Sequence, residues 1–399
     1  MADTADPHHP AGSANGARPL EGVTVVALEA AVAAPFATRQ LADLGADVLK
    51  IERKGEGDFA RNYDSTVAGS SAFFVWANRG KQSIELDMKD PDDRALFDRL
   101  VAGADVFIQN LSPSAAERLG VLADQLRAKH PGLIACDVSG YGLGGPRTDD
   151  KAYDLAIQAE AGAVALTGTA DQACKVGFSA ADIASAMYAF SSIMAALYRK
   201  QVTGEGATVE VSMLESLAEW TAAPVYAAVG MGETPQRSGH RHTMIAPYGM
   251  YELANGEYVM IGVQSNRDWA AFAEHVLLDA SLTTDPRFVE NTDRINNIDD
   301  LESLITKAFT EASAEEILGR LQTGKVTHSS VRTPPTLWAH EQLRARDRFM
   351  DLATPTGQAE VYRPPFNISG MGPPVAAIPA LGQHDPALIQ RLLDRADER

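Results

Sequence analysis

Residues 22–53, GVTVVALEAAVAAPFATRQLADLGADVLKIER, read as a strand, a helix and a second strand. The run VTVVAL is apolar and rich in β-branched residues, as buried strands are. The segment PFATRQLADLG has helical spacing and ends at Gly45, a residue type common just after helix C-termini. The run ADVLKIE reads as another apolar strand. Two strands joined by a helix predict a βαβ unit with parallel strands.

The same alternation continues along the chain. SIELDM (83–88), ADVFIQNL (104–111) and GLIACDVSGYG (132–142) are strand-like, whereas DPDDRALFDRLVAG (90–103) and SAAERLGVLADQLRAKH (114–130) have helical spacing. Helices that connect parallel strands pack on the faces of one sheet through right-handed crossovers. The sequence therefore predicts an α/β fold with a Rossmann-like large domain built on a parallel sheet.

The later part of the chain has a different pattern. Residues from about 223 to 246 read as a linker, and PYGMYELANGEYVMIGV (247–263) reads as a hairpin that turns at Asn255-Gly256. Further segments have helical spacing: 153–200, 268–277 and 301–321. We expect the proline-rich C-terminal stretch to be extended and to pack back onto the large domain. The predicted parts are a disordered tail (1–18), the large domain (19–222 and 330–399), and a linker with a smaller α+β domain (223–329).

The composition restricts the partners of the protein. Its formal net charge is −18 at pH 7, so nucleic acid and anionic membrane surfaces would repel it. Cys136 and Cys174 are too few for a disulfide framework or a cysteine metal site, which suits a reducing cytoplasm. The apolar run 187–197 is interrupted by Ser191 and Ser192, so we interpret it as a buried helix and predict no membrane span.

Motifs for a bound dinucleotide, nucleoside triphosphate or metal are missing. LEAAVAAP rather than GxGxxG follows the first strand, and no Walker loop occurs. The glycine-rich GYGLGGP (140–146) reads as a flexible loop. His240 and His242 have no acidic or cysteine partner nearby in the sequence, so we predict no metal site and no permanently bound cofactor.

Asp182 opens a strongly apolar helical segment, GFSAADIASAMYAFSSIMAAL (177–197). A carboxylate at a helix N-terminus is stabilised by free amides and the helix dipole, so one interpretation is a capping residue. The other interpretation is a nucleophile, because carboxylates form covalent intermediates and the small neighbours Ala181 and Ser185 leave room for a substrate. Position alone favours the capping role.

Basic residues stand near predicted strand ends and loops, namely Arg53, Lys89, Arg118 and Lys151. Arg53 and Lys89 follow the second and third strands, at the edge of a parallel sheet where α/β folds bind ligands. A ligand with several phosphates would bring such cations together. Taken singly, each one reads as a solvated surface charge.

An ordered set of segments resembles one known family. The segments are PLEGVTVVAL, AAPFATRQLADLGADVLKIER, GDFAR, NRGKQSIELDMK, ADVFIQNLSPSAAERLG, SGYGLGGP, YDLAIQAEAG, DIASAMYAFSSIMAAL, TGEGATVEVSMLES and PALGQHD. In this order they resemble the class III CoA-transferase family, which includes formyl-CoA transferase, the carnitine CoA-transferases and the α-methylacyl-CoA racemases. The resemblance runs from about Pro19 to the C-terminus and is strongest through residue 216.

The resemblance implies an interlocked homodimer and covalent catalysis. In similar transferases, the aspartate that matches Asp182 attacks an acyl-CoA thioester, which forms an aspartyl-acyl anhydride and releases CoA thiolate. The thiolate then gives an aspartyl-CoA thioester, from which an acceptor carboxylate takes up CoA. On this ground we expect Asp182 to be the catalytic nucleophile, acting on a small-molecule acyl-CoA and a carboxylic acid.

The resemblance also assigns contacts to CoA, which is expected as part of the substrate. The residues that match CoA-binding positions of the family are Ala31, Val32, Arg53, Leu86, Lys89, Asn110, Arg118, Lys151, Tyr153 and Asp154. The cations among them are expected to hold the phosphates.

Two departures from the family pattern bear on the reaction. The racemase branch has Gly-His-Asp where this chain has Ala152-Tyr153-Asp154, so the second acid/base that racemisation needs is missing, which favours transfer. QRSGHRHTMIAPYG (236–249) replaces the glycine-rich lid of formyl-CoA transferase. The segments SMLESLAEW and VAAPFATRQLADLG are closer to members that act on succinyl- or mesaconyl-type C4–C5 dicarboxylic acids. An acyl-CoA racemase or isomerase, and a non-catalytic acyl-CoA-binding protein, are the alternatives.

Overall fold

The computed structural model describes residues 16–234 and 236–399. The chain forms two compact units: the first comprises the chain up to Ala163, Val176–Ala227 and Gln342–Arg399, and the second comprises Val164–Lys175 and Ala228–Glu341. The predicted boundaries between the two domains lie at 222/223 and 329/330, and residues 164–175 belong to the predicted large domain. Residues 1–15 of the predicted tail lie outside the described residues.

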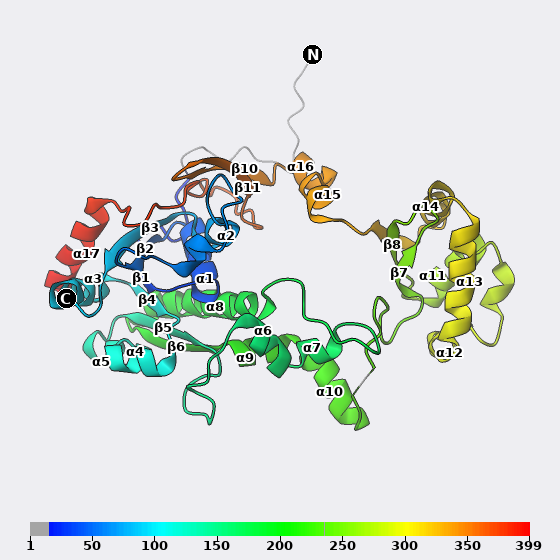
Figure 1. Cartoon of the computed structure of the whole chain (residues 1–399), viewed down its shortest axis with the longest axis horizontal. Helices are drawn as coiled ribbons and strands as arrows, with labels where there is room; N and C mark the ends of the chain where they lie inside the picture. Colours follow the sequence, from blue (N-terminus) through cyan, green and yellow to red (C-terminus); the bar gives the residue numbers. More distant parts are fainter. Residues whose placement is uncertain (1–15, 235) are drawn as a thin grey trace, which may run out of the picture. The chain divides into compact units, whose positions relative to one another are not determined.

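A six-stranded parallel sheet forms the centre of the first unit (Figure 1). Its strands are β1 (Thr24–Leu28), β2 (Asp47–Arg53), β3 (Lys81–Leu86), β4 (Val106–Gln109), β5 (Ile134–Ser139) and β6 (Ala207–Ser212). The spatial order is β3-β2-β1-β4-β5-β6, and each neighbouring pair is parallel. The predicted parallel α/β architecture is confirmed. The order reverses between β1 and β4, a point where open α/β sheets bind ligands.

Helices and a small hairpin surround this sheet. They are α1 (Ala33–Asp43), the 3-10 helix η1 (Phe59–Asn62), α2 (Ala72–Asn78), α3 (Pro91–Gly103), α4 (Pro113–Leu119), α5 (Ala123–Lys129), α6 (Asp154–Glu160), α8 (Ala180–Thr203), α9 (Met213–Trp220), β10 (Phe349–Thr354), β11 (Gly357–Tyr362) and α17 (Pro386–Glu398). Three more helices lie across the boundaries of the units: α7 (Ala163–Leu166), α10 (Ala222–Met231) and α16 (Glu341–Ala345).

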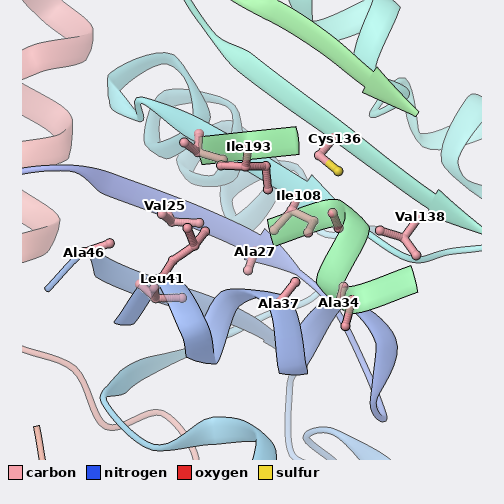
Figure 2. Close-up of a cluster of buried hydrophobic side chains, with 14 of the residues drawn as sticks. Val25, Ala27, Ala34, Ala37, Leu41, Ala46, Ile108, Cys136, Val138 and Ile193 are labelled. Carbon is pink, nitrogen blue, oxygen red and sulfur yellow. The ribbon is translucent and has the colours of Figure 1, made fainter. Parts of the chain in front are cut away.

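Side chains alternate between the two faces of the sheet along each strand, and both faces are buried. Val25 and Ala27 of β1 pack in one cluster with residues of α1 and α8, among them Leu41 and Ile193 (Figure 2). Val26, between them, packs with residues of α3, α5 and α17 on the opposite face. Burial on both faces explains why these strands read as continuous apolar runs rather than as alternating ones.

α8 is the apolar helix predicted around residues 187–197. It is long and apolar enough to cross a membrane by length and composition alone. Ala186, Ala189 and Ile193 are buried, however, in the cluster that joins α8 to α1 and the sheet. α8 is therefore a core helix of the first unit, as the sequence analysis expected.

Three local predictions differ from the structure. Residues 114–130 form two helices instead of one, because Gly120 adopts a left-handed φ of 66° and ends α4. α10 occupies part of the predicted linker at 223–246. The C-terminal stretch is not only extended: β10 and β11 form an antiparallel hairpin, and α17 lies beside α3 (Figure 1).

The second unit combines an antiparallel sheet with helices. Its elements are β7 (Tyr248–Glu252), β8 (Tyr258–Gly262), β9 (Thr327–Ser330), α11 (Asn266–Ala271), the π-helix Phe272–Val276, the 3-10 helix Ala280–Thr283, α12 (Asn291–Asn296), α13 (Ile298–Glu311), α14 (Ala314–Thr323) and α15 (Pro334–Trp338). Trp269, Phe272 and Phe309 are buried in its own core. Gly256, with a φ of 81°, provides the hairpin turn predicted there.

Candidate active site

Asp182 lies in the first turn of α8. The helix begins after Ser179, whose side chain makes no capping hydrogen bond. Instead, Oδ1 of Asp154 in α6 accepts hydrogen bonds from the backbone amides of Ala181 (2.8 Å) and Asp182 (3.2 Å). The capping role that position alone favoured for Asp182 therefore belongs to Asp154.

The carboxylate of Asp182 has an unusual environment. Among the described residues, no amide, hydroxyl or cationic group donates a hydrogen bond to it. Burial raises the pKa of Asp182 to about 7, and the negative charge of Asp154 acts in the same direction. This carboxyl group therefore changes its ionisation state near neutral pH. Perturbed carboxyl groups of this kind are concentrated at catalytic sites.

Gln158 holds Asp154 in place. Its side chain, 1% exposed, donates from Nε2 to Oδ2 of Asp154 (2.7 Å) and to the carbonyl oxygen of Phe178 (3.1 Å). Its Oε1 accepts from the backbone amide of Val176 (2.8 Å). One buried amide therefore ties α6 to the segment that leads into α8. This role of Gln158 was not predicted, because a glutamine inside a helical segment carries no signal of such contacts in the sequence.

Tyr63 belongs to a group of half-exposed aromatic side chains and is affected by the charge of Asp182. Burial and the charges of Asp58 and Asp182 raise the pKa of Tyr63, so its phenol lies within electrostatic range of Asp182. The ring of Tyr63 packs against Phe59 (5.7 Å between centroids) and Phe73 (5.6 Å), and all three side chains are 39–51% exposed. Exposed aromatic groups beside a perturbed carboxylate are typical of a ligand site. Phe59 lies in the segment GDFAR, but no role was predicted for this aromatic group from the sequence.

Two predicted contact segments meet where the strand order reverses. Asn110, directly after β4, accepts at Oδ1 from the amide of Ala30 (2.9 Å) and donates from Nδ2 to the carbonyl oxygen of Ala30 (2.9 Å). The structure thereby brings the predicted CoA contacts Ala31, Val32 and Asn110 to the same edge of the sheet. This edge is the carboxyl end of the strands.

The other predicted CoA contacts lie at the surface or at strand ends. Arg53 and Leu86 end β2 and β3 and are register partners, and Arg53 forms an exposed ion pair with Glu56 (2.8 Å). Tyr153, just before α6, is 73% exposed. Lys89, Arg118 and Lys151 are exposed, and none of them forms an ion pair with another described residue. Their side chains are available to a ligand, and their convergence on one ligand stays a prediction.

The cysteine and histidine candidates make other contacts. Cys136 is buried in β5, and burial raises the pKa of its thiol, whereas Cys174 is exposed. In the second unit, His242 stacks on Tyr248 with the ring centroids 5.2 Å apart. Over residues 16–234 and 236–399, no group of three or more His, Cys, Asp or Glu side chains could hold a metal ion.

The sequence is similar to those of known CoA-transferases. Residues 20–385 match the family described as CoA-transferase family III. The acetyl-CoA:oxalate CoA-transferase of Acetobacter aceti is 36% identical over 298 residues, which cover 74% of this chain and 76% of that protein. The succinyl-CoA:glutarate CoA-transferase of Homo sapiens is 30% identical over 400 residues, which cover 98% of this chain and 89% of that protein.

The fold agrees with the sequence match. The crystal structure of a CAIB/BAIF family protein from Brucella suis superposes with a TM-score of 0.83 and 30% sequence identity, over 94% of this chain and 99% of that chain. Residues 20–385, which match the family, include the six-stranded sheet, α8 with Asp182, and the second unit. The chain therefore belongs to CoA-transferase family III, a family of enzymes.

Proposed function

We propose that the protein transfers CoA from an acyl-CoA to a carboxylic acid and that Asp182 is the nucleophile. The observation that carries this proposal is the state of the Asp182 carboxylate, which is largely buried, has no hydrogen-bond donor among the described residues and has a pKa raised to about 7. Because Asp154 caps α8, this carboxylate is available to attack an electrophile. A more basic carboxylate is also a better nucleophile once it is ionised.

The proposed reaction keeps the energy of the thioester. A carboxylate oxygen of Asp182 attacks the thioester carbonyl carbon, the C–S bond breaks, and CoA leaves as its thiolate, so a mixed anhydride forms. The thiolate then attacks the side-chain carbonyl carbon of Asp182, which releases the donor acid as a carboxylate and leaves an aspartyl-CoA thioester. An acceptor carboxylate repeats both steps in reverse and frees Asp182. The net reaction exchanges one carboxylate for another.

For substrates, we propose succinyl-CoA as donor and a C4–C5 dicarboxylic acid as acceptor. The human relative is named for succinyl-CoA and glutarate, and the Acetobacter relative is named for oxalate. Succinate, glutarate and oxalate each have two carboxyl groups, whereas the acetyl group in the name of the Acetobacter relative has one. The CoA phosphates would meet Arg53, Lys89, Arg118 and Lys151, local cations on a chain whose net charge is −18.

We propose further that two chains form a homodimer, interlocked as the family resemblance implies. α10 has the apolar sequence AAPVYAAVGM, but none of its residues is buried. Tyr226 and Val229 of α10 are 71% and 77% exposed, and Tyr198 and Val202 of α8 are 75% and 70% exposed. Apolar surface of this kind is typical of an interface. Light scattering after size exclusion should give twice the chain mass, and a stable monomer would contradict the dimer.

The remaining proposal concerns location. Cys136 and Cys174 are both free thiols. Unpaired cysteines suit a reducing compartment, so we propose the cytoplasm.

The decisive experiment traps the covalent intermediate. The protein is incubated with succinyl-CoA or acetyl-CoA, quenched with hydroxylamine, and digested for mass spectrometry, with Asp182→Asn as control. We expect a hydroxamate on Asp182 only in the unsubstituted protein, and CoA transfer to glutarate or oxalate in parallel assays. Transfer that persists in Asp182→Asn would overturn the proposed nucleophile. Exchange of the α-proton of the acyl group in deuterated water, without transfer, would instead support the racemase alternative.

A further inference from the structure

The loop after β1 has a backbone conformation that needs support. Ala31 has a φ of 62°, in the left-handed region that residues with a Cβ atom rarely adopt. Its backbone amide donates a hydrogen bond to Oδ1 of Asp58 (3.1 Å). The preceding residue, Ala30, is held by Asn110 through both its amide and its carbonyl group. Two side chains from elsewhere in the fold therefore fix this short loop.

Asp58 is buried and makes contacts in several directions. Its Oδ1 also accepts from the backbone amide of Ala60 (2.9 Å), which caps η1. Its own amide donates to Oε2 of Glu52 (2.8 Å). Its Oδ2 lies 2.9 Å from Nζ of Lys50. One carboxylate thus links the interior of β2 to the loop after β1 and to the start of the helix that contains Phe59.

Lys50 is fully buried in the middle of β2 and forms an ion pair with Asp58. Burial alone would lower the pKa of Lys50, but the carboxylates of Glu29 and Asp58 raise it above its ordinary value, so the ammonium group is charged. Nζ of Lys50 lies 3.4 Å from Oε1 of Glu29, and the same oxygen lies 2.7 Å from Nζ of Lys81. The result is a buried chain of alternating basic and acidic side chains that ends at the Ala31 amide.

We infer that Asp58 is a positioning residue for CoA: it fixes the left-handed conformation of Ala31, and Lys50 fixes Asp58. A buried ion pair adds little net stability over apolar residues of the same volume, whereas it does define a geometry. The loop that it defines contains Ala31 and Val32, at the point where the strand order reverses. This inference rests on the proposed function and on the CoA contacts of Ala31 and Val32 that the family resemblance implies.

The first test compares Asp58→Ala with the unsubstituted chain, using free CoA as the probe and isothermal titration calorimetry. Without Asp58, the left-handed state of Ala31 loses its support, so we expect the Kd for CoA to rise roughly 5- to 30-fold. Adding Ala31→Gly to Asp58→Ala should recover most of the affinity, because glycine adopts positive φ without a steric penalty. A merely structural role of Asp58 predicts no recovery, since a glycine does not restore buried contacts.

Two further variants test whether CoA affinity depends on the hydrogen bond from Ala31 to Asp58, on the charge of Asp58, or on the stability of the fold. Asp58→Asn keeps an oxygen that can accept from Ala31 and Ala60, so its Kd should stay within about twofold while its thermal stability falls. Asp105→Ala is the matched control: Asp105 accepts from the amide of Thr24 (3.1 Å) and pairs with Arg395 (3.0 Å), but at the opposite edge of β1 and β4. Its Kd should equal that of the unsubstituted chain.

If Asp58→Ala does not fold, Ala31→Val replaces it, because a β-branched residue disfavours positive φ without disturbing the buried charges. Unchanged CoA affinity in Asp58→Ala or Ala31→Val would overturn the inference, as would a double variant no better than Asp58→Ala alone. Failure of the proposed function would give a different result, because the unsubstituted protein itself would then bind no CoA. That result would also overturn the inference.

Discussion

The side chain of Asp154 accepts a hydrogen bond from the backbone amide of Asp182 at 3.2 Å, and its negative charge raises the pKa of the same residue. The hydrogen bond fixes where Asp182 stands at the start of α8. The charge, added to burial, makes the Asp182 carboxylate more basic. One side chain therefore affects both the position and the ionisation of the proposed nucleophile.

The rate of CoA transfer should depend on pH through Asp182. Its pKa of about 7 means that the ionised, nucleophilic form is lost as the pH falls below 7. Asp154→Asn removes the charge but keeps an oxygen that can cap α8, so the acidic limb of the kcat profile should move roughly one unit lower. The measurement is a pH profile of kcat for both proteins. An unmoved limb would show that Asp154 does not influence the ionisation of Asp182.

Asp182 should also reduce stability as the pH rises from 3.8 to about 7. A folded-state pKa raised from 3.8 to about 7 means that the folded chain retains a proton that the unfolded chain releases, so stability falls as the pH rises through this window. Asp182→Asn removes this effect, because the amide resembles the protonated acid. We expect its gain in Tm to be larger at pH 8 than at pH 5, as measured by scanning calorimetry. An equal gain at both pH values would contradict the raised pKa.

Gln158 should contribute more to stability and to kcat than Gln390, an exposed glutamine with a similar local hydrogen bond. Gln158→Leu removes the buried hydrogen bonds that Gln158 makes with Oδ2 of Asp154 and with the amide of Val176, so we expect the free energy of unfolding to fall by about 1–3 kcal/mol. We also expect kcat to fall more than the KM for acyl-CoA rises, because the displaced segment leads into Asp182. Denaturant unfolding and steady-state kinetics measure both effects.

The control is Gln390→Leu in α17. Gln390 donates to Asp394, four residues away, at 2.7 Å, the same spacing and distance as between Gln158 and Asp154, but it is exposed. This variant should change stability by less than about 0.5 kcal/mol and leave kcat unaltered. If both glutamine variants behave alike, the contacts of Gln158 with the segment before α8 have no functional role.

The exposed cations should contribute to CoA binding through charge. Arg118→Ala and Lys151→Ala should each raise the KM for acyl-CoA several-fold at low salt, with kcat little changed, because each removes an attraction to phosphate. The difference should shrink as salt screens the charges. Lys307→Ala, an exposed lysine in the second unit, is the control and should have no effect. Equal KM values for all three variants would exclude these cations from the site.

The sequence by itself determined the parallel α/β core, because the signals for it are local. Apolar runs separated by helical segments specify strands and crossovers whatever the rest of the chain does. Asn255-Gly256 specified its hairpin for the same reason. The ordered segments around Asp182 were also sufficient for the family, and the family match confirms it.

Only the tertiary structure decided which carboxylate caps α8 and which one is free. Asp154 reaches the amides of Ala181 and Asp182 across 27 and 28 positions of the chain. In the same way, Asp58 supports Ala31 from 27 positions away, and Lys50, in the interior of β2, forms an ion pair with Asp58. A sequence pattern records the polarity of each residue but not its partner, and burial, hydrogen bonding and pKa all depend on the partner.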